Sequence, residues 1–141
     1  MLIDTNVLVY RVDARFPDKQ RVAAERMRAG VEAGSAFIAH QSIVEFVAAT
    51  TRGRPERRLL DFAEAAREAE ELMAQFPVIY PDATVLHTAL RGAVAYSMSW
   101  FDAHLWACAE VNGITELLSE DFEHDRLYGT VRVTNPFSEP G

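Results

Sequence analysis

Four acidic residues stand where apolar segments of the chain begin or end. Asp4 follows the apolar start of the chain, Glu45 lies in SIVEF, Asp102 in SWFDAHLWACA and Asp121 in LLSED. In α/β proteins the carboxyl ends of parallel strands and the helices they feed share one edge of the sheet, where side chains gather in a crevice. Carboxylate oxygens are preferred ligands of Mg²⁺ and Mn²⁺. The four acids therefore predict a divalent metal site assembled from four distant segments.

Each acid taken alone also has a purely structural explanation. Ser42 with Glu45, and Ser99 with Asp102, match the capping box, in which the acid bonds back to the amide of the capping residue. The other two acids fit turns that leave a strand. The placement of all four at one expected edge of the sheet favours the metal site.

Other catalytic chemistries lack their usual motifs in this sequence. The chain has four histidines and one cysteine, with no H-x-x-H or C-x-x-C pair, so a zinc site is not supported. It has no G-x-S-x-G elbow and no glycine-rich phosphate loop. Cys108 stands alone, which excludes an intramolecular disulfide and favours a reducing compartment.

The length and composition predict one globular domain over residues 1–141, with 49% hydrophobic and 25% charged residues. No apolar run approaches ~18 residues and Met1 leads directly into a strand, so we expect no membrane span, no signal peptide and a cytoplasmic location. The net charge of −7 argues against a general nucleic-acid coat. It is uneven, because residues 1–58 hold ten basic and seven acidic side chains and residues 59–141 hold four and fourteen.

The pattern of the elements predicts an α/β protein. Short apolar strands alternate with stretches of helical periodicity, which is typical of a parallel sheet covered on both faces. We expect a three-layer α/β/α domain with a short, mostly parallel central sheet of about five strands. The expected strands are residues 2–3, 36–39, 78–80, 116–118 and 131–133, and the main expected helices are 43–51, 59–76, 82–96 and 100–112.

A cluster of four arginines lies at a helix junction, in the basic half of the chain. Its members are Arg52, Arg54, Arg57 and Arg58. Guanidinium groups this dense can hold phosphates, and they can equally decorate a solvated loop. Both interpretations remain open at this point.

With these residues in place, the chain resembles a PIN-domain ribonuclease of the VapC type, the toxin of a bacterial toxin–antitoxin pair. MLIDTNVLVY resembles the opening strand and first metal-binding acid of that family, and HQSIVEF the helix that carries its glutamate. SMSWFDAHLWACAEVNG and LLSEDF are similar to the segments of the third and fourth acids, and VRVTNPF to the last strand of one subgroup. The resemblance covers nearly the whole chain.

The resemblance implies a PIN-like fold and a metal-dependent endoribonuclease that cleaves single-stranded or loop RNA. It assigns Asp4, Glu45, Asp102 and Asp121 to Mg²⁺ or Mn²⁺, and it makes Asn6 and Ser119 polar supports of those acids. Glu120 occupies a place often filled by asparagine in relatives, so its role as a ligand stays open. Products with 5′-phosphate and 3′-hydroxyl ends, a homodimer and a cognate antitoxin are also implied.

Two other function classes stay open from the sequence. A haloacid-dehalogenase-like phosphohydrolase also begins with a strand that ends in aspartate, but it needs a second aspartate two positions later, where this chain has Asn6. A non-catalytic PIN-like module would keep the fold and use its helices to bind protein. Four intact acids argue against the second alternative.

Overall fold

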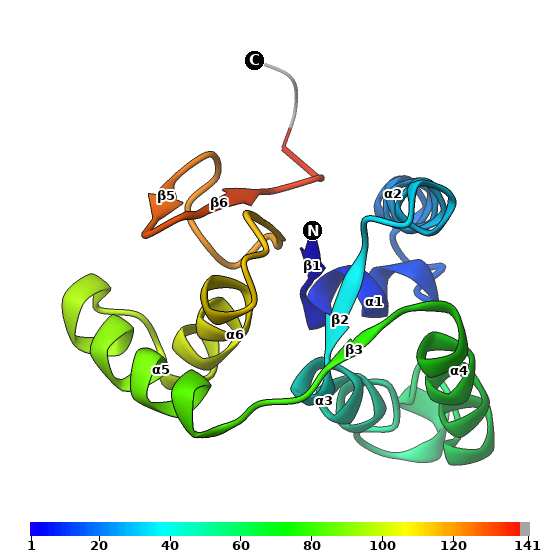
Figure 1. The fold of residues 1–141 in the computed structure, drawn as a ribbon. Helices are drawn as coiled ribbons and strands as arrows, with labels where there is room; N and C mark the ends of the chain where they lie inside the picture. Colours follow the sequence, from blue (N-terminus) through cyan, green and yellow to red (C-terminus); the bar gives the residue numbers. More distant parts are fainter. Residues whose placement is uncertain (139–141) are drawn as a thin grey trace.

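The computed structural model describes residues 1–138 and confirms the expected α/β/α fold, a mostly parallel sheet with helices on both faces (Figure 1). The last three residues of the expected domain lie outside that range. The strands are β1 (Leu2–Ile3), β2 (Phe37–Ala39), β3 (Val78–Ile79), β4 (Glu116–Leu118), β5 (Leu127–Tyr128) and β6 (Val131–Thr134). The helices are α1 (Thr5–Arg11), α2 (Pro17–Ala33), α3 (His40–Thr50), the 3₁₀ turn η1 (Pro55–Arg57), α4 (Phe62–Gln75), α5 (Ala83–Tyr96) and α6 (Trp100–Val111).

The two faces of the sheet carry two separate hydrophobic cores. Successive residues of a strand point to opposite faces, so Leu2 and Leu117 pack with α5 and α6, whereas Ile3 and Leu118 pack with the helices α1 to α4. Figure 1 shows α5 and α6 on one side of the strands and α1, α2 and α4 on the other. This alternation fixes the face of the sheet on which each strand residue packs.

The order in which strands are added to the sheet reverses between β1 and β4. The strand order is β3-β2-β1-β4-β6-β5, so the chain first extends the sheet to one side of β1 and later returns to its other side. Ile3 lies opposite Leu118, and the amide of Asp4 donates to the carbonyl of Leu118 at 3.0 Å. Open α/β sheets bind ligands at such a switch point, outside the carboxyl ends of the strands. The residues that follow β1 and β4 are therefore placed together.

The sheet has one strand more than the sequence predicted. β5 pairs antiparallel with β6, with Leu127 opposite Arg132, and the hairpin turns at Gly129, whose φ is 60°. A positive φ is the conformation that glycine adopts at least cost in a tight turn. The sequence did not indicate this strand, because Leu127 and Tyr128 stand between Arg126 and Gly129 and are not part of a longer apolar run.

Two expected helix caps differ from the structure. Ser42 does not cap α3, because β2 runs directly into a helix that starts at His40, with Ala39 in the capping position and Ser42 buried inside. Ser99 does precede α6, but its side chain makes no capping hydrogen bond. Asp82 caps α5, since its carboxylate accepts from the amide of Val85 at 3.0 Å. The structural explanation of Glu45 and Asp102 as capping-box partners therefore fails.

The helices of residues 1–138 include none that is long and apolar enough to cross a membrane.

Candidate metal centre

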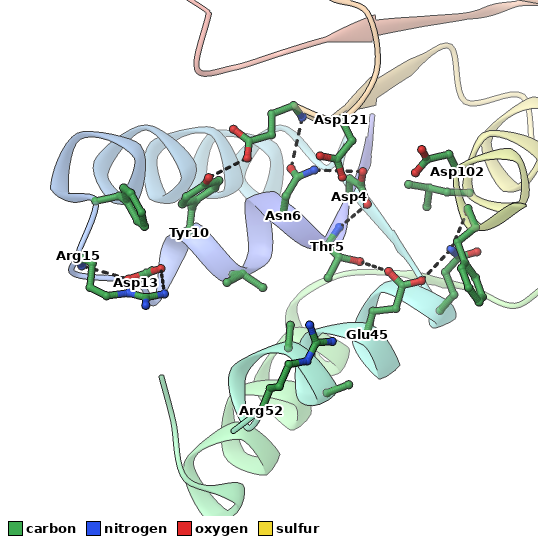
Figure 2. Close-up of a pocket in the computed structure, with 18 residues that line it drawn as sticks. Asp4, Thr5, Asn6, Tyr10, Asp13, Arg15, Glu45, Arg52, Asp102 and Asp121 are labelled. Carbon is green, nitrogen blue, oxygen red and sulfur yellow. Dashed lines mark hydrogen bonds and ion pairs between the residues drawn. The ribbon is translucent and has the colours of Figure 1, made fainter. Parts of the chain in front are cut away.

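Three of the four predicted acids meet at the carboxyl edge of the sheet. Asp4 follows β1, Asp102 lies in the first turn of α6 and Asp121 follows β4. Each offers a carboxylate oxygen, and these oxygens lie within 4.8 Å of one another. Figure 2 shows the three side chains pointing toward one another across the mouth of a cavity of about 530 Å³. We call these three residues the acid group.

Asp4 is the most firmly held member of the acid group. Its side chain is almost completely buried, at 5% exposure. One oxygen accepts from the amide of Thr5 at 2.6 Å, and the other accepts from the Ser119 hydroxyl at 2.6 Å and the Asn6 amide group at 3.3 Å. A buried carboxylate fixed by three donors has little freedom to change its direction.

The environment of the acid group disfavours negative charge. Burial raises the pKa of Asp4 to about 7, with smaller upward contributions from Asp121 and Asp102, and two hydrogen bonds oppose the rise. Burial also raises the pKa of Asp102, the nearby charges of Asp121 and Glu45 add to the rise, and the Ser99 hydroxyl opposes it. A cation bound between crowded carboxylates stabilises their ionised forms and offsets the repulsion between them.

Glu45 lines the same cavity but lies outside the acid group. Its two oxygens accept from the Thr5 hydroxyl at 2.9 Å and from the Gln41 side-chain amide at 3.2 Å. The carbonyl oxygen of Gln41 in turn contacts Nδ1 of His104 on α6. This chain of polar contacts ties α1, α3 and α6 together around Glu45. Gln41 was not among the predicted site residues, although its position four residues before Glu45 puts both side chains on one helix face.

The two expected polar supports lie beneath the acid group. The Ser119 hydroxyl donates to Asp4 and accepts from the amide of Asp121 at 3.1 Å. Asn6 donates to Asp4 and to Ser119, and its carbonyl oxygen accepts from the amide of Glu120 at 3.4 Å. The loop after β4 is thereby bonded to the loop after β1.

Glu120 lines the cavity, and both of its oxygens are already engaged. One accepts from the Tyr10 hydroxyl at 2.7 Å, and the other accepts from the Lys19 ammonium at 3.0 Å. Lys19 also lies over the ring of Tyr10, 4.6 Å from its centre. No sequence pattern indicates this contact, because residues 10, 19 and 120 come from three separate segments.

The arginine cluster divides in the structure. Arg52 lines the cavity beyond the end of α3, whereas Arg54, Arg57 and Arg58 do not line it. Nε of Arg58 instead donates to a carbonyl of its own loop at 2.8 Å. Arg15, which no sequence pattern singled out, also lines the cavity.

The donor set of the acid group suits a hard divalent cation. Within the described part of the chain, the atoms that converge are carboxylate oxygens from three aspartates, with no imidazole nitrogen or thiolate among them. Oxygen ligands on a site that keeps room for water are typical of Mg²⁺ and Mn²⁺ and untypical of zinc. The residues present therefore fit the ion that the sequence predicted.

Replacing Asp102 with asparagine tests the convergence without any substrate. We expect the Asp102→Asn variant to melt at the same temperature as the parent, or higher, in chelator, because the substitution removes a half-buried charge beside Asp121 and Glu45. We also expect Mn²⁺ to raise the melting temperature of the variant less than that of the parent, since ligands stabilise the state they bind. Differential scanning calorimetry with and without Mn²⁺ measures both effects.

A matched variant, Asp82→Ala, removes an aspartate that caps a helix. It should melt lower in chelator, by the equivalent of about 0.5–2 kcal/mol, and keep the full Mn²⁺ response. If Asp102→Asn behaves like Asp82→Ala, Asp102 is a structural residue and not part of a metal site.

Comparison with known proteins agrees with this geometry. The chain is similar over 98% of its length to a chain of a toxin-antitoxin complex from Klebsiella pneumoniae, of which 98% is covered, with 16% identity and a TM-score of 0.67. It is similar over 95% of its length to a chain of VapBC2 from Rickettsia felis bound to a promoter DNA fragment, of which 96% is covered, with 11% identity and a TM-score of 0.71. It is also similar over 96% of its length to a chain of FitAcB from Neisseria gonorrhoeae, of which 97% is covered, with 15% identity and a TM-score of 0.63.

At these low identities the solved structures establish the fold alone. A search of curated proteins finds no match. The family model of the PIN domain matches residues 1–129 and so spans β1 to β5 and all the acids described above. The sheet order, the helices on both faces and this match agree, and they leave the haloacid-dehalogenase alternative without support. The chain therefore belongs to the PIN domain family.

Proposed function

We propose that the protein is a Mg²⁺- or Mn²⁺-dependent endoribonuclease that cleaves single-stranded or loop RNA. The observation that carries the proposal is the convergence of the Asp4, Asp102 and Asp121 carboxylates within 4.8 Å at the carboxyl edge of the sheet, in an open cavity. PIN domains are generally nucleases, and a set of oxygen donors is the usual means of placing a divalent ion against a phosphodiester.

In this proposal the acid group and Glu45 hold the cation, and their neighbours fix the ligand directions. Ser119 and the Thr5 amide hold the carboxylate of Asp4, while Thr5 and Gln41 hold Glu45. A bound ion of this kind supplies Lewis acidity toward the phosphate and lowers the pKa of water. No side-chain nucleophile is required, which agrees with the absence of a serine or cysteine motif from the sequence. Products with 5′-phosphate and 3′-hydroxyl ends are expected.

In the same proposal Glu120 is a support and not a ligand. Its oxygens are taken by Tyr10 and Lys19, so its contribution is to anchor the loop that carries Asp121. The Lys19 ammonium also offsets one negative charge at the cavity, which lowers the repulsion that an approaching RNA meets.

We extend the proposal to the biological setting of a toxin of a type II toxin–antitoxin pair. The structures to which the chain is similar are a toxin-antitoxin complex and VapBC2, which supports a cognate antitoxin as a partner. A homodimer is supported by an apolar stripe on the outer face of α5, where Leu86, Leu90 and Val94 are 45%, 51% and 85% exposed. Sedimentation velocity of the purified protein should give a dimer, and a small neighbouring reading frame should encode a protein that binds it.

The test of the proposed activity is cleavage of RNA by purified protein. A panel of structured and unstructured RNAs is incubated with Mn²⁺ and with Mn²⁺ plus excess chelator, beside single-stranded DNA of the same sequences. Cleavage at defined positions that chelator stops, with 5′-phosphate ends at the new termini, supports the proposal. Intact RNA in every Mn²⁺ reaction contradicts it.

We predict that the loop arginines beside Arg52 contribute to RNA affinity through phosphates. The double variant Arg54→Ala/Arg58→Ala should bind every RNA more weakly, and the slope of log K against log salt should flatten by about 0.7 for each phosphate of a single strand that is no longer bound. Fluorescence anisotropy over a series of salt concentrations measures the slope. Arg21→Ala, in α2 and paired with Asp18, is the matched control. An unchanged slope in the double variant would return the cluster to the solvated-loop interpretation.

A further inference from the structure

The acid group occupies only part of its cavity, and two phenylalanines are among the other residues that line it. Phe16, at the start of α2, is 46% exposed, and Phe101, beside Asp102 on α6, is 68% exposed. Each lies next to a residue that also lines the cavity, Arg15 in the first case and Asp102 in the second. Large apolar side chains left open beside a polar cleft are typical of a binding surface.

The Phe16 side of the cavity is a built and rigid surface. The guanidinium of Arg15 lies over the ring of Phe16, 5.8 Å from its centre, and Tyr10 packs against the same ring edge to face at 5.7 Å. Arg15 is itself fixed, since Nε and Nη2 donate to the buried carboxylate of Asp13 at 2.9 and 2.8 Å. The Arg15 side chain nevertheless stays 68% exposed, so its remaining N–H groups are available to bind a ligand.

The cavity extends from the acid group toward Arg15. In Figure 2, Arg15 lies at the left and the acid group toward the right, with Asn6 between them. Arg52 rises from the end of α3 on the Glu45 side of the same space (Figure 2). A strand of RNA laid along this row would run from Arg15 to the acid group.

The charges of the cavity explain why aromatic contacts are needed. Among the described residues that line it, six are acids, and the cations that oppose them are Arg15 and Arg52. Such a surface repels a polyanion, so phosphate contacts alone give it little affinity. Stacking of an unpaired base on an aromatic ring does not depend on net charge and contributes several-fold to affinity per base.

We propose that Phe16 and Phe101 are stacking platforms for unpaired bases of the RNA that the acid group cleaves, with Arg15 and Arg52 holding its phosphates. The inference rests on the proposed nuclease function and adds the residues that select single-stranded RNA. A duplex keeps its bases stacked inside the helix and cannot use either ring. The platforms therefore make the cavity selective for unpaired RNA through its bases, while the acid group acts on the backbone.

The test compares leucine variants of the two platforms, because leucine keeps apolar packing and removes the ring face. The dissociation constant of a short labelled single-stranded RNA is measured in chelator by anisotropy, and cleavage is measured with Mn²⁺. We expect Phe16→Leu and Phe101→Leu each to weaken binding by about fivefold or more at every salt concentration. Their KM should rise while kcat changes little, and binding of the duplex form should be unaltered.

Arginine variants should change the salt dependence of RNA binding, unlike the leucine variants. Arg15→Gln and Arg52→Gln should flatten the salt slope by about 0.7 each, which the leucine variants should not do. Arg15→Lys keeps a positive partner for Asp13 but lacks the planar guanidinium with its several N–H donors. It therefore separates the loss of guanidinium contacts with RNA from a loss of folding. Circular dichroism confirms that each variant is folded.

Two controls match the exposure of the tested residues. Phe62→Leu changes a phenylalanine that is 66% exposed at the start of α4, and Arg21→Gln changes an arginine whose side chain is 62% exposed. Neither residue lines the cavity. Both controls should bind and cleave like the parent.

The outcomes separate this inference from the proposed function. If the parent cleaves RNA and the leucine variants bind single strands like the parent, the platforms are wrong and the nuclease stands. If Phe101→Leu changes the sedimentation of the protein and not its RNA affinity, Phe101 belongs to a protein interface and its platform role is wrong. If the parent neither binds nor cleaves RNA, the nuclease proposal and the inference both fall.

Discussion

We expect Asp4→Asn to abolish RNA cleavage and to leave a folded protein. Asparagine keeps the shape of the side chain, and its carbonyl oxygen can still accept from the Thr5 amide, although its amide nitrogen cannot accept from Ser119. The substitution removes the charge that a hard cation requires. Loss of residues that merely support a metal ligand typically costs about 10- to 100-fold in affinity or activity. Loss of the ligand itself should cost at least as much, and Asp102→Asn should behave likewise.

The measurement is kcat/KM for RNA with Mn²⁺, using variants purified in parallel with the parent. Because host nucleases copurify, the residual rate of Asp4→Asn also sets the background of the assay. The control is Asp61→Asn, which changes an exposed capping residue of α4 and should leave the rate unchanged. Full activity in both Asp4→Asn and Asp102→Asn would show that the acid group is not the catalytic site.

We expect the binding of Mn²⁺ to strengthen steeply as the pH rises toward about 7. The folded protein holds a proton on Asp4, whose pKa is raised to about 7 by burial, and the cation must displace that proton. With one proton released per ion, affinity should rise about tenfold per pH unit up to about pH 7 and then level off. Isothermal titration calorimetry in buffers of different ionisation enthalpy gives both the affinity and the number of protons released.

The same pKa gives the metal-free protein an uncommon dependence of stability on pH. In the unfolded chain Asp4 returns to its ordinary pKa of 3.8. Between that value and about 7 the folded state binds more protons than the unfolded state, so the free energy of unfolding falls as pH rises. The contribution of Asp4 is fully present below pH 3.8 and is lost as the pH rises through about 7.

The control for both pH effects is Asp4→Asn, which has no proton to hold at this position. Its stability in chelator should lack the fall between the unfolded and folded pKa values of Asp4. The affinity of this variant for Mn²⁺ should no longer rise with pH through release of a proton at position 4. A variant that keeps the parent's pH dependence would show that the proton is held elsewhere in the acid group.

The sequence predicted the layers of the fold because its apolar periods are local. The five predicted strands are apolar runs between turn residues, and all five are present near their expected bounds. β5 was missed because its two residues pair only with a neighbouring strand across a tight turn. The start of α3 was misplaced because a serine three residues before an acid fits a capping box, whereas tertiary packing draws the helix back to the end of β2.

The candidate site shows the same division between local pattern and tertiary structure. Acids at strand ends can be found in a sequence, since a parallel sheet collects such residues at one edge. The sequence could not show that Glu45 stands apart from the acid group, because that depends on how far α3 lies from β1 and β4. The sequence also could not show the partners of Glu120, because the loop after β4 meets Tyr10 and Lys19 only in the folded chain.

The order of amino acids was thus enough to predict a type of chemistry, through the identity and spacing of the acids, and the class of fold, through the apolar periods. Which carboxylates meet, which are neutralised by a partner, and that Arg15, Phe16 and Phe101 share one cavity became visible only in three dimensions. The physical reason is range: hydrophobic periodicity and capping act within a few residues. Distances between carboxylates from three segments are set by the packing of a whole sheet and its helices.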